Sequence, residues 1–249
     1  MNRARDNEPN WDELAALPGL RGVIDPADLD GAKNQIIDRA HKRAVRRGIG
    51  TLHGKRVLDF GCGIGRLSAW LIEHGAEVHG VDASIPMVEL AKARAPSGRF
   101  DLIDDTEPKL PIAAYDVVLT VGVLQYFAAE RKRLTRLLGH LATALAPGGQ
   151  LVAIEQVNDQ GLDRGGSFSL YRGSFEDAGC ELVNAIPVRL GHSRILHVAM
   201  RHSLLSRVPV LPDLLRWEAR LRGAAGNGLE APRYSEWLFV ATRRLGPPS

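Results

Sequence analysis

Three glycines at alternate positions, Gly61, Gly63 and Gly65, follow a short apolar stretch and precede a segment with helical spacing of apolar residues. Glycine lets a backbone approach a ligand closely and adopt φ values that other residues avoid. Leu67 and Leu71 repeat at helical spacing, so the loop opens a helix whose free N–H groups point toward a ligand. This order of strand, glycine loop and helix constrains the chain to an α/β fold with a nucleotide site after its first strand.

Two details of the loop indicate which nucleotide it binds. A dinucleotide-binding loop has its third glycine one position later, where this chain has Arg66. Asp59 lies just before the first glycine, and its charge would repel a pyrophosphate but attract a cationic ligand. The pattern D-x-G-x-G-x-G from Asp59 to Gly65 resembles motif I of the class I S-adenosylmethionine-dependent methyltransferases, whose cofactor is a sulfonium without phosphate.

The resemblance covers residues 55–156, including a Pro-Gly-Gly turn at 147–149 before the fifth strand. It implies a Rossmann-like, doubly wound α/β sheet of seven strands in the order 3-2-1-4-5-7-6, with the last strand antiparallel. It also implies S-adenosyl-L-methionine as cofactor, S-adenosyl-L-homocysteine as product and no metal. The residues assigned to cofactor binding are Asp59, Gly61, Cys62, Gly63, Gly65, Asp82, Ala83, Met87, Asp104, Asp105 and Val121.

Three of these assignments have a competing interpretation. Asp82 is also what an ordinary turn after a strand contains, but its distance of about 20 residues from the loop favours contact with the ribose hydroxyls. Asp104 and Asp105 are both candidates for the adenine amine, and spacing does not choose between them. Cys62 is most simply a small loop residue, because no zinc-ligand spacing accompanies it.

The acceptor side is expected after the fourth strand, which the apolar run 115–121 predicts to be central and covered on both faces. Gln125 and Tyr126 follow it and are candidates for lining the acceptor site, with simple packing as the alternative. Many relatives have histidine where Gln125 stands, and glutamine takes up no proton at neutral pH. Trp11 is a third candidate from the N-terminal arm, although a packing anchor is the simpler interpretation.

A general base, if one is used, is expected at one of two positions. His192 follows a predicted strand end and is the first candidate. Glu155, at the end of the fifth strand, is the second. His192, His197 and His202 recur every five residues, so they do not share one helix face and a metal site is not expected.

The chain divides into an N-terminal arm with a cap helix (1–50) and a methyltransferase domain (51–249). Residues 1–30 are polar and contain three prolines, so we expect them to be poorly ordered unless docked. The domain carries an insert at 191–232 that is rich in leucine. The insert is a lid over the acceptor pocket, a homodimer contact, or a surface helix touching a lipid or carrier protein; the lid is favoured and the dimer comes second.

Composition limits the partners. The net charge of +3 is too small to indicate nucleic acid, and aromatic residues that would stack bases are not interleaved with the basic ones. A basic group at Lys42, Arg43, Arg46 and Arg47 is most simply a solvated helix face, and attraction of an anionic acceptor is the minority interpretation. No apolar stretch has the length of a membrane span, so no stable membrane insertion is expected. Two cysteines give no disulfide framework, and a cytoplasmic location is the default expectation.

The sequence therefore predicts an enzyme that transfers a methyl group from S-adenosylmethionine to a small-molecule acceptor. Family analogy favours O-methylation of a natural product or a sugar-like substrate. One alternative is a nicotinamide-dependent oxidoreductase, against which Arg66 and the missing Tyr-x-x-x-Lys pair argue. The other is a protein that binds the cofactor without methyl transfer.

Overall fold

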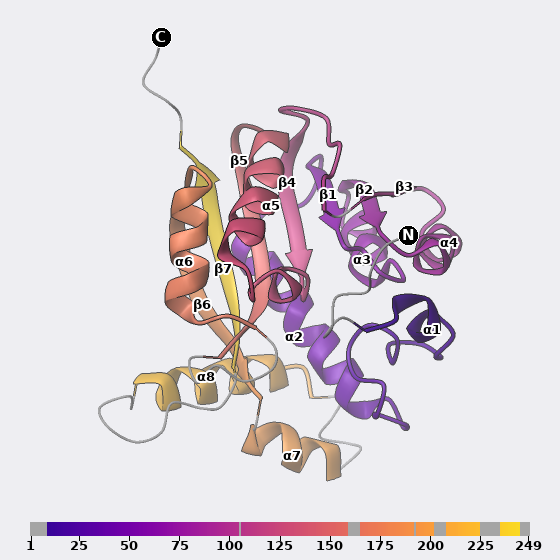
Figure 1. Cartoon of the computed structure of the whole chain (residues 1–249). Helices are drawn as coiled ribbons and strands as arrows, with labels where there is room; N and C mark the ends of the chain where they lie inside the picture. Colours follow the sequence, from indigo (N-terminus) through magenta and orange to yellow (C-terminus); the bar gives the residue numbers. More distant parts are fainter. Residues whose placement is uncertain are drawn as a thin grey trace.

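A computed structural model describes residues 9–104, 106–158, 165–191, 193–201, 208–224 and 235–244. Its strands form one seven-stranded sheet in the order β3-β2-β1-β4-β5-β7-β6 (Figure 1). Strand β7 runs antiparallel to both of its neighbours, whereas the other pairs are parallel. The predicted order and the antiparallel last strand are therefore confirmed. The strands are β1 (Arg56–Phe60), β2 (Glu77–Asp82), β3 (Arg99–Leu102), β4 (Tyr115–Val121), β5 (Leu145–Val157), β6 (Cys180–Leu190) and β7 (Ser235–Arg243).

Helices cover both faces of the sheet (Figure 1). Helices α5 and α6 pack into the apolar core on one face, and α2, α3, α7 and α8 pack into the core on the other. The helices are α1 (Trp11–Ala15), α2 (Ala32–Ile49), α3 (Arg66–Glu73), α4 (Ile85–Arg94), the 3-10 turn η1 (Leu124–Tyr126), α5 (Arg131–Ala144), α6 (Phe168–Asp177), α7 (Arg194–Arg201) and α8 (Leu211–Ala224).

The central strands are apolar at nearly every position because successive side chains enter different cores. In β4, Val118 packs into the core that contains α5 and α6, whereas Val117 and Leu119 pack into the opposite core. This arrangement is the one expected for a strand covered by helices on both faces. It explains why the sequence shows a continuous apolar run here instead of alternation.

The N-terminal arm is docked on the domain from residue 9 onward. Asp12 accepts a hydrogen bond from the Ser84 hydroxyl at 2.6 Å, at the start of α4. An apolar cluster ties the arm to the domain through Ile64 and Met87, with Trp11 and Val23 packed against it. The sequence predicted order in the arm only if it docks on the domain, and the described part of the arm does so.

The described part of the predicted insert, between β6 and β7, contains α7 and α8. Within it, the Glu218 carboxylate of α8 accepts the hydroxyl of Ser193 and, at 2.9 Å, the N–H of Arg194. The carboxylate thereby joins α8 to the start of α7. In the part of the chain that the structure describes, no helix has the length and apolar character needed to cross a bilayer.

Candidate functional site

The glycine loop between β1 and α3 depends on left-handed backbone angles. Gly61, Gly63 and Gly65 have φ values of 72°, 53° and 71°. A Cβ at Gly63 would lie 2.8 Å from Cγ1 of Val23, and one at Gly65 would lie 2.9 Å from Cα of Ala91. The loop therefore needs glycine both for its backbone angles and for the close approach of neighbouring segments.

Asp82, the last residue of β2, lies against this loop. Its Oδ2 accepts the N–H of Gly63 at 2.8 Å, and its Oδ1 accepts the N–H of Ser84 at 3.0 Å. Ser84 also caps α4 by accepting the N–H of Met87. These bonds fix the Asp82 carboxylate at the junction of the glycine loop and α4.

Asp59 and Cys62 are buried beside the loop. The Ser68 hydroxyl donates to Oδ2 of Asp59 at 2.6 Å. Burial raises the pKa of Asp59 to about 6, although Ser68 and Arg66 act in the opposite direction, so the carboxyl is largely ionised at pH 7. Burial also raises the pKa of the Cys62 thiol, so it stays protonated and acts as a packing group.

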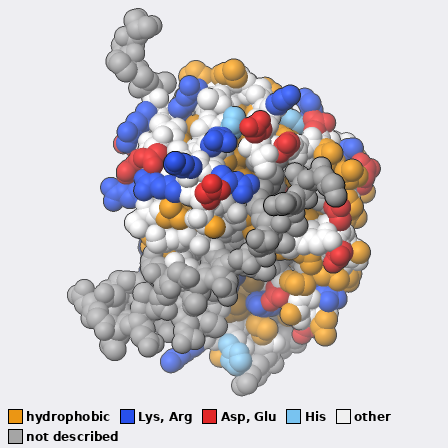
Figure 2. All heavy atoms as spheres, viewed as in Figure 1, with side chains coloured by type: hydrophobic (Ala, Val, Ile, Leu, Met, Phe, Trp, Pro, Cys, Tyr) orange, Lys and Arg blue, Asp and Glu red, His pale blue; other side chains and the backbone are white. Residues whose placement is uncertain are grey.

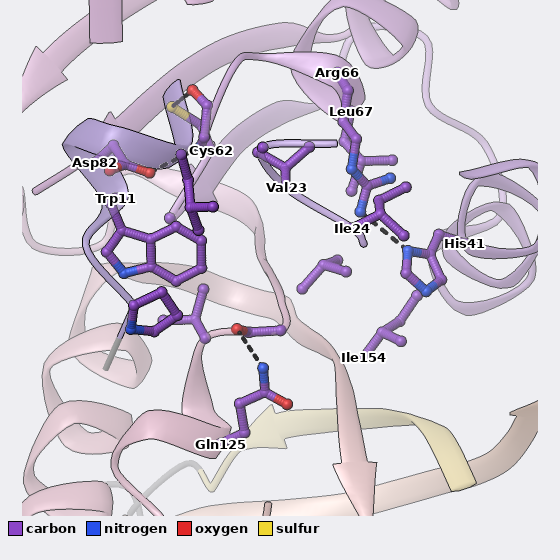
Figure 3. Close-up of a pocket in the computed structure, with 18 of the residues that line it drawn as sticks. Trp11, Val23, Ile24, His41, Cys62, Arg66, Leu67, Asp82, Gln125 and Ile154 are labelled. Atoms are coloured by element: carbon purple, nitrogen blue, oxygen red, sulfur yellow. Dashed lines mark hydrogen bonds between the residues drawn. The ribbon is translucent and has the colours of Figure 1, made fainter. Parts of the chain in front are cut away.

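A cavity of about 370 Å³ joins the glycine loop to the ends of β4 and β5 (Figure 3). Its volume falls within the range of small-molecule sites, roughly 300–1,000 Å³. Figure 3 shows Trp11 and Asp82 on one side of it, Arg66 and His41 on another, and Val23 of the arm between them. The arm is therefore part of the site.

The arm is held in place by polar contacts with the start of α2. Lys33 forms an ion pair with Asp25. The side-chain amide of Asn34 donates to the carbonyl of Asp25 at 2.9 Å, and its backbone N–H donates to Asp28 at 2.7 Å. Lys33 and Asp25 both line the cavity, so these contacts shape its boundary.

Glu155 holds the turn that follows β4. Its Oε1 accepts the hydroxyl of Thr120 at 3.1 Å and the N–H groups of Val123 and Leu124 at 3.1 and 3.0 Å. Its Oε2 accepts the N–H of Gln125 at 3.1 Å. Burial raises the pKa of Glu155 to about 7, against the effect of these hydrogen bonds. The carboxylate thus takes the place of a cap for the first N–H groups of η1.

The turn presents Gln125 and Tyr126 to the cavity. The Nε2 of Gln125 donates to the carbonyl of Gly122 at 3.1 Å. Among the described residues, its Oε1 is buried without a hydrogen-bond partner. The Tyr126 ring packs edge-on against Trp11, with centroids 5.5 Å apart. A buried oxygen at a cavity wall is a group that a ligand donor would satisfy.

Five buried charged or polar side chains form a network that we call the polar wall: Asp38, His41, Arg66, Arg189 and Glu236. Arg66 donates to Asp38 Oδ1 at 2.9 Å and to His41 Nδ1 at 3.0 Å. His41 Nε2 lies 3.0 Å from Glu236 Oε2, which also accepts from Arg189 Nε at 2.8 Å. Because Arg66 donates to Nδ1, the proton of neutral His41 is on Nε2 and is donated to Glu236.

The protonation states of the polar wall are fixed near neutral pH. Burial lowers the pKa of His41, so the ring is neutral at pH 7. Burial alone would raise the pKa of Glu236, but Arg189 and His41 lower it to about 2. His41, Arg66, Arg189 and Glu236 line the cavity, so the polar wall forms one of its boundaries.

The cavity brings together most of the residues that the sequence predicted. Those on the cofactor side are Asp59, Gly61, Cys62, Gly63, Asp82, Ala83, Met87 and Val121, and those on the acceptor side are Trp11, Gln125, Tyr126 and Glu155. Gly65 and Asp104 are not among its lining residues. Gly65 is the N-cap residue of α3, and Asp104 accepts the N–H and hydroxyl of Thr106 at 2.9 and 2.6 Å. Asp105 and His192 lie outside the described residues.

Sequence reasoning missed most of the polar wall. Arg66 stood out only because it replaces a glycine, and His41, Arg189 and Glu236 were not identified. The signal available at His41 is a histidine on the apolar face of a helix, which is usually structural. Its partner Glu236 is 195 positions away, so no local pattern connects the two.

Comparison with known proteins agrees with this geometry. Residues 58–151 match the family model of a methyltransferase domain. The ubiquinone biosynthesis O-methyltransferase of Coxiella burnetii is 34% identical over 145 residues, which cover 57% of this chain and 54% of that protein. The chain spans about half the length of the curated relatives it matches.

Solved structures share the fold. An S-adenosylmethionine-dependent methyltransferase from Mesorhizobium loti superposes with a TM-score of 0.58 at 19% identity, covering 82% of this chain and 98% of that one. Geranyl diphosphate C-methyltransferase from Streptomyces coelicolor, in complex with Mg²⁺, geranyl diphosphate and S-adenosyl-L-homocysteine, gives 0.61 at 16% identity, covering 92% and 88%. At these identities the likeness concerns the fold alone.

Proposed function

We propose that this chain, which belongs to the class I S-adenosylmethionine-dependent methyltransferase family, transfers a methyl group from S-adenosyl-L-methionine to a small-molecule acceptor. The observation that carries the proposal is the shared cavity. It joins the glycine loop and Asp82 to Gln125, Tyr126 and Glu155. A cofactor site and an acceptor site that share one cavity are what group transfer requires.

The cofactor side fits this cofactor by its chemistry. At Gly63, a Cβ would lie 2.8 Å from Val23, so only a residue without a side chain fits between the loop and the arm that lines the cavity. Asp82 is fixed by two backbone N–H groups and is our candidate acceptor for the ribose hydroxyls. The buried charge of Asp59 favours a cation over a phosphate. Asp104 and Asp105 stay predictions for the adenine amine.

The cofactor, when bound, supplies a methyl group that its sulfonium already activates. The chain's own residues then align the acceptor and exclude water. Trp11 and Val23 of the arm line the cavity and cover the glycine loop side of it. Tyr126 packs on Trp11, so closure of the arm and placement of the acceptor turn are linked.

The acceptor side supports a hydroxyl-bearing substrate. The buried Oε1 of Gln125 calls for a donor, and a hydroxyl group supplies one. Several curated relatives are named as ubiquinone biosynthesis O-methyltransferases, and others as probable tRNA methyltransferases. We therefore infer O-methylation, with a natural product or a sugar-like molecule as the substrate class.

Glu155 is our candidate for handling the hydroxyl proton. It lines the cavity, and the pKa of about 7 that burial gives it suits a base working near neutral pH. Its Oε2 accepts the N–H of Gln125, and a carboxylate oxygen has room for a second donor. His192 stays a prediction for the same role.

The first experiment is isothermal titration with S-adenosylmethionine, S-adenosylhomocysteine and NADH in parallel. We expect micromolar affinity for the first two and no binding of the third. Formation of S-adenosylhomocysteine in the presence of hydroxylated acceptors then tests turnover. Binding of NADH instead would restore the oxidoreductase alternative, and cofactor binding without turnover on any acceptor would favour a protein that only binds it.

A further inference from the structure

Helix α8 exposes a stripe of large apolar side chains. Val210, Leu214, Trp217 and Leu221 are 53%, 42%, 58% and 51% exposed. They recur at i, i+4, i+7 and i+11, so they share one face of the helix. The face that α8 turns toward the domain is separate and buries Leu211, Leu215 and Ala219. The stripe is therefore surplus to the packing of the domain.

Arginines gather along one flank of this stripe. Arg43 and Arg47 of α2 both pair with Asp213 of α8, and Arg216 lies 3.9 Å from the same carboxylate. Burial, followed by the positive charges of Arg47 and Arg220, lowers the pKa of Arg216. Positive charge at this junction therefore exceeds the negative charge that Asp213 supplies.

The same junction contains a donor without an acceptor. The Nε of Arg216 is buried and has no hydrogen-bond partner among the described residues. A small hollow at this point is lined by Arg43, Arg47 and Arg216, together with Pro187 and Pro212. A buried guanidinium donor beside converging arginines is a site that an anionic oxygen would satisfy.

Basic residues on the other face of the sheet are arranged differently. Arg131 and Arg172 form ion pairs with Asp177 and Glu176. On the face shown in Figure 2, basic and acidic side chains are interspersed. At the α8 junction, by contrast, Arg43, Arg47 and Arg216 share the single carboxylate of Asp213 beside exposed apolar side chains.

We propose that α8 and the arginines at its flank form a docking face for an anionic lipid surface. Leucine and tryptophan side chains enter the boundary between headgroups and acyl chains, and arginines bind the phosphates beside them. Helix α8 has 14 residues, fewer than the roughly 20 that span a bilayer, so it lies on the surface instead of crossing it.

The charge argues for lipid over a second copy of this chain. A two-fold interface places the same patch of both copies face to face. The positive charges of one copy would then face the same positive charges of the other, and their repulsion would oppose association. The residues concerned are Arg43, Arg47, Arg216 and Arg220. An anionic membrane offers the complementary charge and the apolar layer together.

The docking face lies at the end of the sheet that carries the cavity. Arg189 and Glu236 line the cavity, and the insert with α7 and α8 starts and ends within a few residues of them. Figure 1 shows both helices beyond this end of β6 and β7. Docking through α8 would therefore bring the acceptor end of the molecule close to the lipid.

The test is co-sedimentation of the full chain with vesicles of phosphatidylcholine alone and of phosphatidylcholine with phosphatidylglycerol. We expect binding to the second and little to the first, weakening as salt is added. Trp217 emission should shift to shorter wavelength on binding. The double variant Trp217→Glu/Leu221→Glu should weaken vesicle affinity by roughly tenfold or more. Arg216→Glu/Arg220→Glu should remove the preference for the anionic vesicles.

The matched control is Val183→Glu, which changes an apolar side chain of β6 that is 52% exposed. It should bind vesicles like the wild type, and all variants should keep their cofactor affinity as evidence of folding. Equal binding to both vesicle types would overturn the proposal. A concentration-dependent dimer that the Trp217→Glu/Leu221→Glu variant abolishes, without vesicle binding by the wild type, would assign the stripe to self-association instead.

Discussion

The two sides of the cavity are built in different ways. Apart from Val121, the predicted cofactor-side residues that line the cavity come from one stretch, from Asp59 through Met87, in which glycine backbone angles shape the loop. The polar wall comes from residues between Asp38 and Glu236, joined by side-chain bonds between α2, α3, β6 and β7. The proposed cofactor site is thus a largely local motif, whereas the wall depends on the tertiary structure.

The largest expected effect is on the wall. Glu236→Gln should lower the free energy of unfolding by about 3–5 kcal/mol, because it leaves the buried charge of Arg189 without its partner. Chemical denaturation measures it. Asp177→Asn, which breaks the exposed pair with Arg131, is the control and should cost less than about 1 kcal/mol. Equal losses in the two variants would show that the wall is not held by its ion pairs.

Gly63→Val tests the loop on the cofactor side. Its φ of 53° strains a branched residue, and its Cβ would lie 2.8 Å from Val23. We expect cofactor affinity to fall by about 100-fold, or about 2.7 kcal/mol, in titration. Gly54 also has a positive φ, of 72°, but no atom lies within 4 Å of where its Cβ would be. The Gly54→Val variant therefore separates the effect of backbone strain from that of a steric clash. Unchanged affinity in a folded Gly63→Val protein would remove the loop from the site.

Asp82→Ala should weaken cofactor binding by about 2 kcal/mol through loss of charge-assisted hydrogen bonds. The alanine also removes the acceptor for the N–H of Gly63, so Asp82→Asn is needed beside it. The asparagine keeps an oxygen for the loop but loses the charge. Full affinity in both folded variants would contradict the ribose assignment.

Glu155→Gln should have the smallest effect on binding, on the acceptor side. As the candidate base it should also lower kcat by about 100-fold or more, because glutamine cannot take up the hydroxyl proton. The amide places a donor where Oε2 accepts the N–H of Gln125, so the turn loses one bond. We expect the acceptor KM to rise about fivefold, worth about 1 kcal/mol, while cofactor affinity stays unchanged. A change confined to cofactor affinity would instead assign Glu155 to the cofactor site.

The pH dependence gives a second readout for Glu155. Burial raises its folded pKa to about 7 from 4.5, so the folded state holds the proton more tightly than the unfolded chain. This group therefore contributes stability below about pH 4.5 that is lost as pH rises through about 7. Activity should instead rise as pH increases through about 7, because the ionised carboxylate accepts the four donors of the turn. Glu155→Gln should flatten both profiles near pH 7, and a retained inflection would assign it to another group.

The fold and the cofactor side were predictable because their signals are local. A glycine at φ of 53°, a strand-end acid bonded to it and an apolar run covered on both faces each leave a pattern within a few residues. Strands β6 (Cys180–Leu190) and β7 (Ser235–Arg243) leave a weaker local signal. Polar residues such as Arg189 and Glu236 belong to these strands and line the cavity, so the strands lack a continuous apolar pattern in the sequence.

Arg66 shows where local reading ends. In the sequence, Arg66 stands out because it occupies the position at which a dinucleotide-binding loop has its third glycine. No neighbouring residue in the sequence indicates its hydrogen-bond partner. The structure brings Asp38 and His41 to it from α2, at 2.9 and 3.0 Å. Its role as a link in the wall follows from how α2 packs on α3, which no spacing in the sequence encodes.

The sequence by itself determined the glycine loop and the strand-end acid, because backbone angles and hydrogen bonding restrict which residues stand at those positions. The sheet order was implied by the family resemblance that these motifs carry. Only the tertiary structure decided the polar wall, the docked arm over the loop and the role of Glu155 in holding η1. These features depend on side chains that are far apart in the sequence. Their charges can be buried only where the fold places a hydrogen-bonding or oppositely charged partner beside them.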